Sequence, residues 1–261
     1  MTRRRWIADS WTENTALLVG DQALHLARVL RAEPGMESDV IAGGRVWHAA
    51  IASVAEDEVR FDLLTELDSE PALPVTLLLS VFKFDRMEWA IEKVTELGVA
   101  QILPVLARRT EKHLAQAAPK RVERWRRVVR EAAQQCRRSD TPLVGEAVAI
   151  KLVVQQSGTR DQTERDGIDH EKSGSTAAAL KVVLSEQEQS VTLRRALGGA
   201  ITSGAAVPRI EIAIGPEGGW APEEIALFQA EGWIAVTLGA RILRAETAAI
   251  TALAVIAAFL P

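Results

Sequence analysis

The chain has 261 residues, of which 48% are hydrophobic and 25% are charged, and its formal net charge is −4. This length accommodates one large domain or two modest ones, with enough apolar residues to fill a sizeable core. The single cysteine, Cys136, excludes an internal disulfide, and the four histidines are too far apart in the sequence to suggest a metal site, so we expect no metal.

The N-terminal segment 1–11 is basic but lacks the apolar core of a signal peptide. The longest apolar run, residues 248–260, is too short to cross the roughly 30 Å of hydrocarbon in a bilayer. We therefore expect a cytoplasmic protein with no membrane partner.

Residues 1–70 are predicted to form mainly short strands. "DVIAGGRVWHAAIASV" contains two apolar runs around Gly43-Gly44, which predicts a hairpin, and "VRFDLL" alternates apolar and polar residues. One helix, "DQALHLARVLRAEPG", is expected between the strands, with Asp21 at its start. A small β-barrel or sheet is thus predicted, and the following "LDSEPALP" is typical of a linker.

Strands alternate with helices in the second part of the chain, residues 74–261. "VTLLLSVF" is a strand of the kind buried on both faces, and "DRMEWAIEKVTELG" is an amphipathic helix that ends at Gly98. "VAQILPVL", "ALKVVLSE", "RIEIAIG" and "WIAVTLG" are further strands, and an apolar helix begins at Glu246. This βα repetition predicts an α/β domain with a mainly parallel sheet. The polar stretch 155–176 is expected to be a mobile surface insertion.

The predicted helix "PKRVERWRRVVREAAQQC" begins a strongly basic segment. Eight basic and two acidic residues lie between Lys120 and Arg138. Since charges more than about 8 Å apart are largely screened, such a segment can bind phosphates despite the negative net charge of the chain.

Ligands of open parallel sheets bind outside the carboxyl ends of the strands. Three predicted strand ends are therefore of interest: "VVLSE" at 182–186, "IGPEGG" at 214–219 and "LGARILRAETA" at 238–248. A plain connection from strand to helix accounts for Pro222, but it leaves the glycine cluster at 215–219 unexplained. Glycines in such number favour positive φ angles or close approach of a ligand to the main chain. The sequence contains neither a P-loop nor a G-x-G-x-x-G motif, so a different ligand geometry is expected.

The segments "HLARVLR", "EKVTELGVAQILPV", "RW…EAAQQCRRSDTP", "IGPEGGW" and "LGARILRAETA" resemble the RsmE family, 16S ribosomal RNA (uracil N3) methyltransferases of the SPOUT superfamily. The resemblance extends over nearly the whole chain. It implies a PUA-like, RNA-binding β-barrel in residues 1–70 and a SPOUT domain with a deep trefoil knot in residues 74–261. It also implies S-adenosylmethionine (SAM) as cofactor, 16S rRNA in the small ribosomal subunit as substrate, and a homodimer. Trp220 and Cys136 depart from the residues usual in the family, Phe and Ser, and the insertion 155–176 is longer than usual.

The resemblance also implies site residues. Those expected to enclose the cofactor are Leu184, Ser185, Gly215, Gly218, Gly219, Leu238, Gly239, Ile242 and Leu243. Uracil N3 carries a proton, and N3 can attack a methyl group only after this proton has left. Arg244 is expected to stabilise the resulting negative charge, and Glu217 or Glu246 to accept the proton or orient the groups that do. Alternatively, each of these residues forms an ion pair that only fixes the loops, for example Arg244 with Glu246 or Glu217.

An enzyme that acts on an unstacked base must also bind the RNA phosphates around that base. The candidates are Arg3, Arg4, Arg5, Arg28, Arg31, Arg124, Arg127 and Arg130, each of which is otherwise a solvated surface residue. The apolar final helix is either core or dimer interface. Two other functions remain open: another SPOUT enzyme, such as a transfer RNA ribose 2′-O-methyltransferase, and a non-catalytic RNA-binding ribosome-assembly factor.

Overall fold

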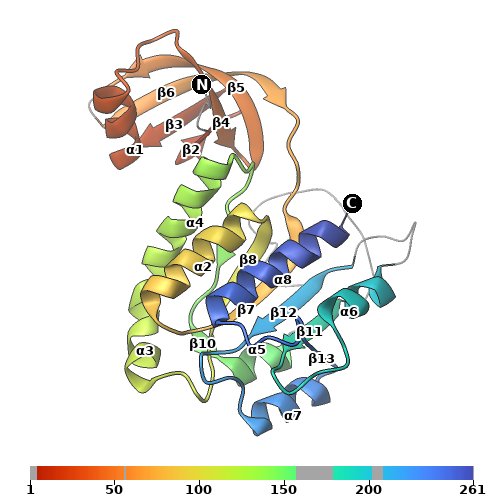
Figure 1. The fold of residues 1–261 in the computed structure, drawn as a ribbon. Helices are drawn as coiled ribbons and strands as arrows, with labels where there is room; N and C mark the ends of the chain where they lie inside the picture. Colours follow the sequence, from red (N-terminus) through yellow and green to blue (C-terminus); the bar gives the residue numbers. More distant parts are fainter. Residues whose placement is uncertain (1–4, 56, 157–178, 202–207, 261) are drawn as a thin grey trace. The chain divides into compact units, whose positions relative to one another are not determined.

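The computed structural model describes residues 5–55, 57–156, 179–201 and 208–260. These residues form two compact units. The first combines Met1–Ala72 with Val129–Thr141, and the second combines Leu73–Val128 with Pro142–Pro261 (Figure 1). Arg3, Arg4 and the expected insertion beyond Gln156 lie outside the described residues.

The first unit contains a curled six-stranded sheet. Its strands are β1 (Arg5–Ile7), β2 (Ser10–Trp11), β3 (Thr15–Val19), β4 (Glu37–Ala42), β5 (Arg45–Val54) and β6 (Glu58–Leu67). They follow the order β1-β4-β5-β6-β3-β2, and all pairs are antiparallel except β1 with β4. Gly43 and Gly44, at φ 60° and 73°, form the turn between β4 and β5, which confirms the predicted hairpin. Trp6, Leu18 and Phe61 are in its core.

The predicted helix within this unit is shorter than expected and changes its winding. It consists of α1 (Asp21–Leu24) followed by a π-helical turn, η1 (His25–Val29). Gly20 rather than Asp21 precedes the helix, and no side chain caps it. Ala23 and Leu26 are its buried residues, so a single apolar contact face holds it against the sheet.

The segment 129–141 completes the first unit although it lies far from it in the sequence. It includes the second half of α4 (Val122–Cys136). Arg130 Nη2 donates hydrogen bonds to Ile7 O at 3.0 Å and to Asp9 Oδ1 at 2.7 Å. Gln134 Nε2 donates to Gln22 Oε1 at 2.7 Å. Polar contacts therefore join this helix end to β1, to the residues after it and to α1.

The second unit is built on a parallel sheet, as predicted. Its strands are β7 (Leu73–Ser80), β8 (Val99–Leu106), β9 (Leu143–Val144), β10 (Val148–Ala149), β11 (Leu180–Leu184), β12 (Ile210–Ile214) and β13 (Ile234–Val236). The order is β10-β8-β7-β12-β11-β13, with β9 also beside β8, and every pair is parallel. All five residues of β12 are buried, because this apolar strand is central and covered on both faces.

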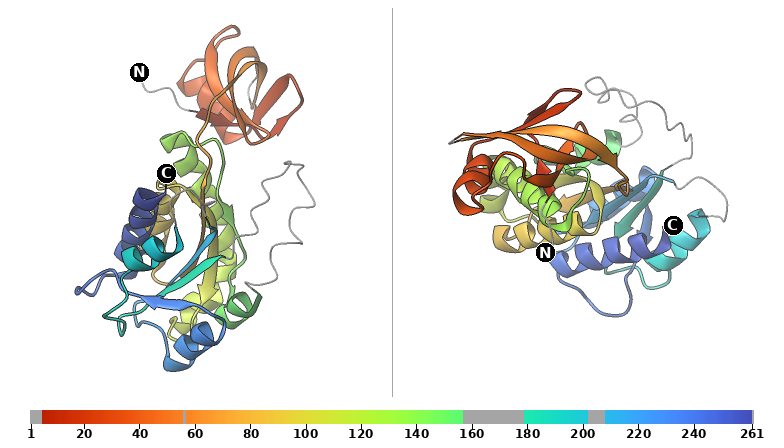
Figure 2. Two further views of the ribbon diagram at one scale, coloured as in Figure 1. Left: turned by 90° about the vertical axis from the view of Figure 1, so that its right-hand side faces the viewer. Right: turned by 90° about the horizontal axis from the view of Figure 1, so that it is seen from above.

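Helices cover both faces of this sheet (Figures 1 and 2). The helices of the unit, besides the first half of α4, are α2 (Phe84–Glu96), α3 (Lys112–Ala117), the 3-10 turn η2 (Ala118–Arg121), α5 (Ile150–Gln156), α6 (Leu193–Ala200), α7 (Pro222–Ala230) and α8 (Ala245–Phe259). Helix α8 packs against α2 and α6, whereas α5 packs against α7. Gly98, at φ 94°, follows α2 as predicted.

The apolar final helix buries one face within its own unit. The buried residues of α8 are Ala245, Glu246, Ala249, Ala252, Leu253 and Ile256. Ala254 and Ala258 are exposed, so the helix is not enclosed on all sides by this chain. None of the helices in the described residues is long and apolar enough to cross a membrane.

Candidate functional site

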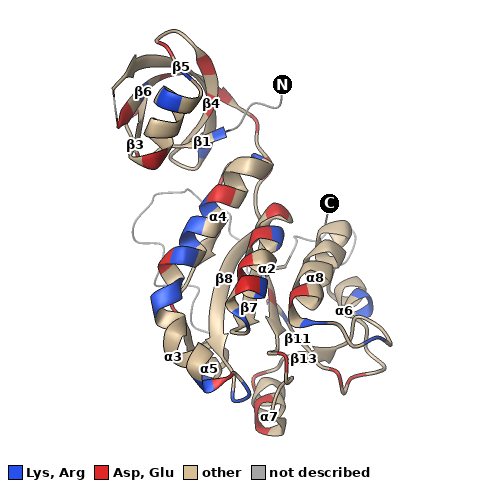
Figure 3. Cartoon of the chain, turned by 60° about the vertical axis from the view of Figure 1, so that its left-hand side comes forward, with Lys and Arg blue, Asp and Glu red and all other residues tan. Residues whose placement is uncertain are grey.

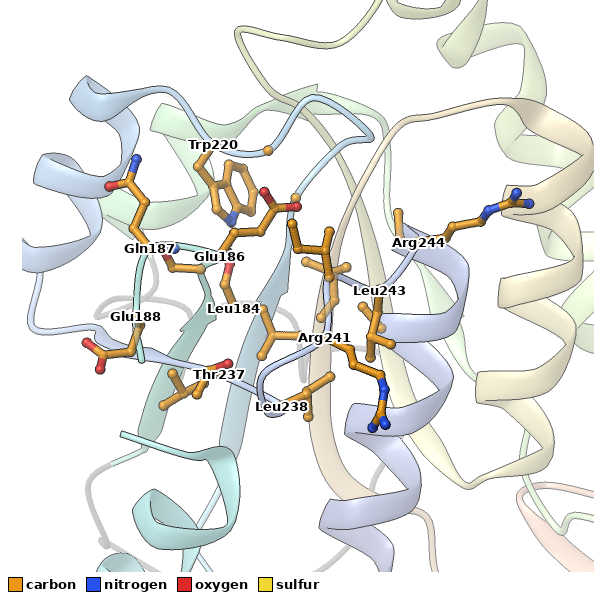
Figure 4. A pocket seen from close by; sticks show the side chains of 18 of the residues that line it. Leu184, Glu186, Gln187, Glu188, Trp220, Thr237, Leu238, Arg241, Leu243 and Arg244 are labelled. Atoms are coloured by element: carbon orange, nitrogen blue, oxygen red, sulfur yellow. Dashed lines mark hydrogen bonds between the residues drawn. The ribbon is translucent and has the colours of Figure 1, made fainter. Parts of the chain in front are cut away.

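A pocket of about 850 Å³ lies at the carboxyl ends of β11, β12 and β13, which are neighbours in the sheet. The loops after these strands and the first turn of α8 line it. Figure 4 shows Leu184, Leu238 and Leu243 around one hollow, with Trp220 and Glu186 at its edge. The lining includes all nine residues that the sequence selected for the cofactor: Leu184, Ser185, Gly215, Gly218, Gly219, Leu238, Gly239, Ile242 and Leu243. Their binding role stays a prediction.

The glycine turn is shaped partly by an aromatic side chain. Trp220 is 6% exposed, donates a hydrogen bond from Nε1 to Leu184 O at 3.0 Å, and stacks edge-on against Phe228 with ring centroids 5.0 Å apart. A Cβ atom on Gly215 would lie 3.2 Å from the same Nε1. Gly215 is therefore explained by the close approach of the indole, which the sequence did not reveal.

Two other positions of the pocket have positive φ angles, which favour glycine. Gly219 has φ +68° and Gly239 has φ +127°, conformations that residues with a Cβ rarely adopt. Gly218 differs, because its φ is not positive and a Cβ there would make ordinary contact with Arg109 Cβ at 3.5 Å. Nothing in the structure requires glycine at position 218.

Acidic residues after β11 also line the pocket, and the sequence analysis assigned them no role. Glu188 Oε1 accepts hydrogen bonds from the backbone N–H of Ser190 at 2.6 Å and of Val191 at 2.9 Å. These bonds, that of Val191 first, lower the pKa of the Glu188 carboxyl below its ordinary value. Glu186 lies in the same loop. The signal in the sequence was the run "SEQEQ" directly behind a strand.

The three proposed catalytic residues do not all reach the pocket. Arg244 and Glu217 line it, whereas Glu246 does not and has only 7% of its side chain exposed. Arg244 is exposed and forms no ion pair with any described residue. The ion pair given as the example of the alternative, Arg244 with Glu217 or Glu246, is therefore absent from the described part of the chain.

Both glutamates instead face Arg86 of α2. Its Nη1 lies 2.9 Å from Glu217 Oε1 and 3.9 Å from Glu246 Oε1. The sequence placed Arg86 on a helix but gave no reason to connect it with residues 131 and 160 positions away. The packing of α8 against α2 brings Glu246 to Arg86, and the turn after β12 brings Glu217.

Two arginines that follow β8, Arg108 and Arg109, bond to the glycine turn and to the helix after it, α7. Arg109 Nη1 donates to Gly218 O at 2.8 Å and also lines the pocket. The backbone N–H of Arg108 donates to Glu224 Oε1 at 2.7 Å. Sequence reasoning missed both, although "ARRT" follows a predicted strand.

The candidate phosphate-binding arginines fall into two groups. Arg5 lies 3.8 Å from Asp39 and also donates to the carbonyl of Arg137. Arg124 lies 3.3 Å from Glu88, and Arg130 is bound to Asp9 as described above.

The remaining described candidates are Arg28, Arg31 and Arg127, which are exposed. Arg31 and Arg127 form no ion pair within the described ranges, so their guanidinium groups are available to a partner. Figure 3 shows basic residues along α4, interspersed with acidic ones.

In the described residues no cluster of His, Cys, Asp or Glu could hold a metal ion.

The second unit is a parallel α/β fold with a ligand-sized pocket at its strand ends, and the comparisons identify its class as an RNA methyltransferase domain. Residues 69–257 match the family model of the RNA methyltransferase domain. The chain is 34% identical to ribosomal RNA small subunit methyltransferase E of Synechocystis, over 95% of this chain and 74% of that protein. It is 32% identical to the protein of that name in Mycobacterium bovis, over 93% of this chain and 86% of that protein.

A solved structure agrees with these relatives. Ribosomal RNA small subunit methyltransferase E of Neisseria gonorrhoeae, crystallised with S-adenosyl methionine, is 27% identical, with a TM-score of 0.75 over 97% of this chain and 95% of that chain. The chain belongs to the ribosomal RNA small subunit methyltransferase E family, which confirms the resemblance seen in the sequence.

Proposed function

We propose that the protein transfers the methyl group of SAM to N3 of a uridine in 16S rRNA of the small ribosomal subunit. The observation that carries the proposal is the pocket at the ends of β11, β12 and β13, lined by all nine residues expected at a cofactor. The family assignment supports it, as does the Neisseria relative, which was solved with this cofactor bound.

The pocket fits SAM chemically. Its volume lies within the roughly 300–1,000 Å³ of typical ligand pockets. Ile242 lines it with 79% of its area exposed, so a bound adenine ring would cover an apolar side chain that the chain leaves open. Glu186 and Glu188 supply negative charge beside a ligand that carries a sulfonium and an ammonium group. When bound, SAM supplies an electrophilic methyl group.

The chain itself must prepare the uracil. Glu217, which lines the pocket, accepts the N3 proton or a hydrogen bond from it. The Arg244 guanidinium, unpaired within the described residues, lies in the same lining and stabilises the negative charge that develops on the uracil oxygens. The base has to leave its stack to enter, so neighbouring phosphates must be held elsewhere on the protein.

The proposal extends to the two parts of the chain. Residues 1–70 form a PUA-like RNA-binding barrel, supported by the curled sheet and by the exposed Arg28 and Arg31. Residues 74–261 form a SPOUT domain with a trefoil knot. Its support is the strand order, in which β12 lies between β7 and β11, and the packing of α8 against α2.

A homodimer through α8 is part of the same proposal. The exposed face of α8 and the neighbouring Trp89 of α2, 48% exposed, offer apolar surface that a second copy would cover. Because the proposed substrate is the small ribosomal subunit, we expect the reaction to take place in the cytoplasm. Light scattering after size-exclusion chromatography tests the dimer, because a monomer at micromolar concentration would contradict it.

Methyl transfer tests the activity directly. Small subunits from cells that lack the endogenous activity are incubated with labelled SAM, digested to nucleosides and analysed by mass spectrometry. N3-methyluridine is the expected product, and Arg244→Ala should abolish it while Arg194→Ala, on the surface of α6, should not. Label on a ribose oxygen would identify a different SPOUT methyltransferase. SAM binding without transfer, with RNA affinity insensitive to Arg244→Ala, would identify a non-catalytic assembly factor.

A further inference from the structure

We infer that Arg86 is a positioning residue that orients Glu217 toward the substrate, and that Glu246 anchors Arg86 rather than acting on the substrate itself. This inference rests on the proposed function, because it concerns how the same pocket handles the uracil.

The geometry connects three elements through one guanidinium group. Arg86 is in the first turn of α2, Glu217 is in the turn after β12, and Glu246 is in the first turn of α8. Arg86 Nη1 is within hydrogen-bond distance of Glu217 Oε1 at 2.9 Å and 3.9 Å from Glu246 Oε1. Of these three, only Glu217 lines the pocket, which makes it the residue placed to touch a base bound there.

Burial separates the roles of the two glutamates. The Glu217 side chain is 34% exposed, as expected for a group that meets a substrate, whereas that of Glu246 is 7% exposed. Glu246 Oε2 is buried without a hydrogen-bond partner among the described residues. A buried carboxylate needs a counter-charge, and Arg86 is the ion-pair partner that Glu246 has in the described chain. The positive N-terminal end of α8 further favours the charge of Glu246.

Glu217 depends on Arg86 for its orientation. It sits between Pro216 and Gly218, and its carboxylate has Arg86 as its hydrogen-bond partner within the described residues. Without Arg86 the side chain would sample several rotamers at the edge of an open pocket. Misplacement of a catalytic group by about 1 Å costs about 100-fold in rate, so the ion pair is worth more to the reaction than to the fold.

The test compares substitutions at Arg86 and Glu217 in the full-length protein, with small subunits as substrate. Arg86→Gln removes the charge, and Arg86→Lys keeps it. We expect Arg86→Gln to lower kcat for N3 methylation about 100-fold, with the dissociation constant of SAM unchanged within about twofold, and Arg86→Lys to recover at least about tenfold. Lys93→Gln, which breaks surface ion pairs with Glu92 and Glu96 on the same helix, is the matched control and should keep the wild-type kcat.

A double substitution distinguishes positioning from a general structural effect. If Arg86 acts through Glu217, adding Arg86→Gln to Glu217→Gln should lower kcat by less than about threefold more. Additive losses, or a wild-type kcat in Arg86→Gln, would overturn the inference. If Arg86→Gln does not fold, Arg86→Met, which also removes the charge, takes its place in the cycle with the same criterion. A wild-type protein that makes no N3-methyluridine would instead overturn the proposed function.

Discussion

Replacing Gly215 by alanine should overpack the contact between the glycine turn and the indole of Trp220. The added methyl carbon would lie 3.2 Å from Nε1, 3.3 Å from Cε2 and 3.4 Å from Cδ1 of Trp220. The indole has little freedom to retreat, since it is bonded to Leu184 O, packed on Phe228 and 6% exposed. Overpacking of this kind lowers the free energy of unfolding by about 1–3 kcal/mol.

The same substitution should cost much less when Trp220 is phenylalanine. All three close atoms belong to the pyrrole half of the indole, which phenylalanine lacks. Trp220→Phe alone loses the 3.0 Å hydrogen bond to Leu184 O, which should lower the free energy of unfolding by about 1 kcal/mol. We therefore expect Gly215→Ala and Trp220→Phe to be non-additive, with the double variant at least about 1 kcal/mol more stable than the sum of the single effects indicates.

Differential scanning calorimetry of the four proteins measures this coupling. For a unit of this size, 1 kcal/mol corresponds to a shift of about 2–4 °C in melting temperature. SAM affinity, measured by titration calorimetry, shows whether the repacked turn still forms the pocket. Stability effects that add to within about 0.5 kcal/mol would refute the reasoning, because Trp220 would then not be what excludes a side chain at position 215.

Three further predictions concern the pocket loops and the arginines. Gly219→Ala should destabilise the protein by about 1–2 kcal/mol because of its positive φ, whereas Gly218→Ala should be nearly neutral in the same thermal melts, and equal effects would contradict this. The lowered pKa of Glu188 stabilises the fold at neutral pH, and this contribution is lost as the pH falls through the folded-state pKa. Glu188→Gln should therefore lower the melting temperature at pH 7 and by progressively less as the pH falls, and a difference that stays the same in acid would refute this. Arg127→Ala should weaken RNA binding and reduce the salt slope of the affinity by about 1 without changing stability, since its side chain is exposed. Arg130→Ala should instead lower the free energy of unfolding by about 1–2 kcal/mol through its lost hydrogen bonds, and the reverse pattern would contradict both expectations.

Periodicity was sufficient to predict the parallel sheet and most of its elements. The apolar runs of β7 and β12 and the amphipathic pattern of α2 each depend on local sequence, so the chain reveals them directly. The place of the pocket followed from the rule that ligands bind at the carboxyl ends of parallel strands. The winding of η1 was not predictable, because no residue in "HLARV" distinguishes a π-helical from an α-helical turn.

Contacts between distant segments could not be predicted. Arg86 pairs with Glu246 because α8 packs against α2, and with Glu217 through the turn after β12, although 160 and 131 positions separate these residues in the sequence. The reason for Gly215 was likewise hidden, since the rotamer of Trp220 decides which residue it contacts. In both cases the residue types were visible in the sequence, but their partners depended on tertiary packing.

The contribution of residues 129–141 to the first unit has a consequence for biosynthesis. Arg130 and Gln134 bond to residues near the N-terminus, and Ser139 Oγ donates to Glu70 O at 3.2 Å. A ribosome that has translated only the first 72 codons has therefore not yet supplied a helix end that this unit uses. Its folding must finish after residues 73–128 of the second unit have been synthesised, and a fragment cut at residue 72 should be less stable than the intact first unit.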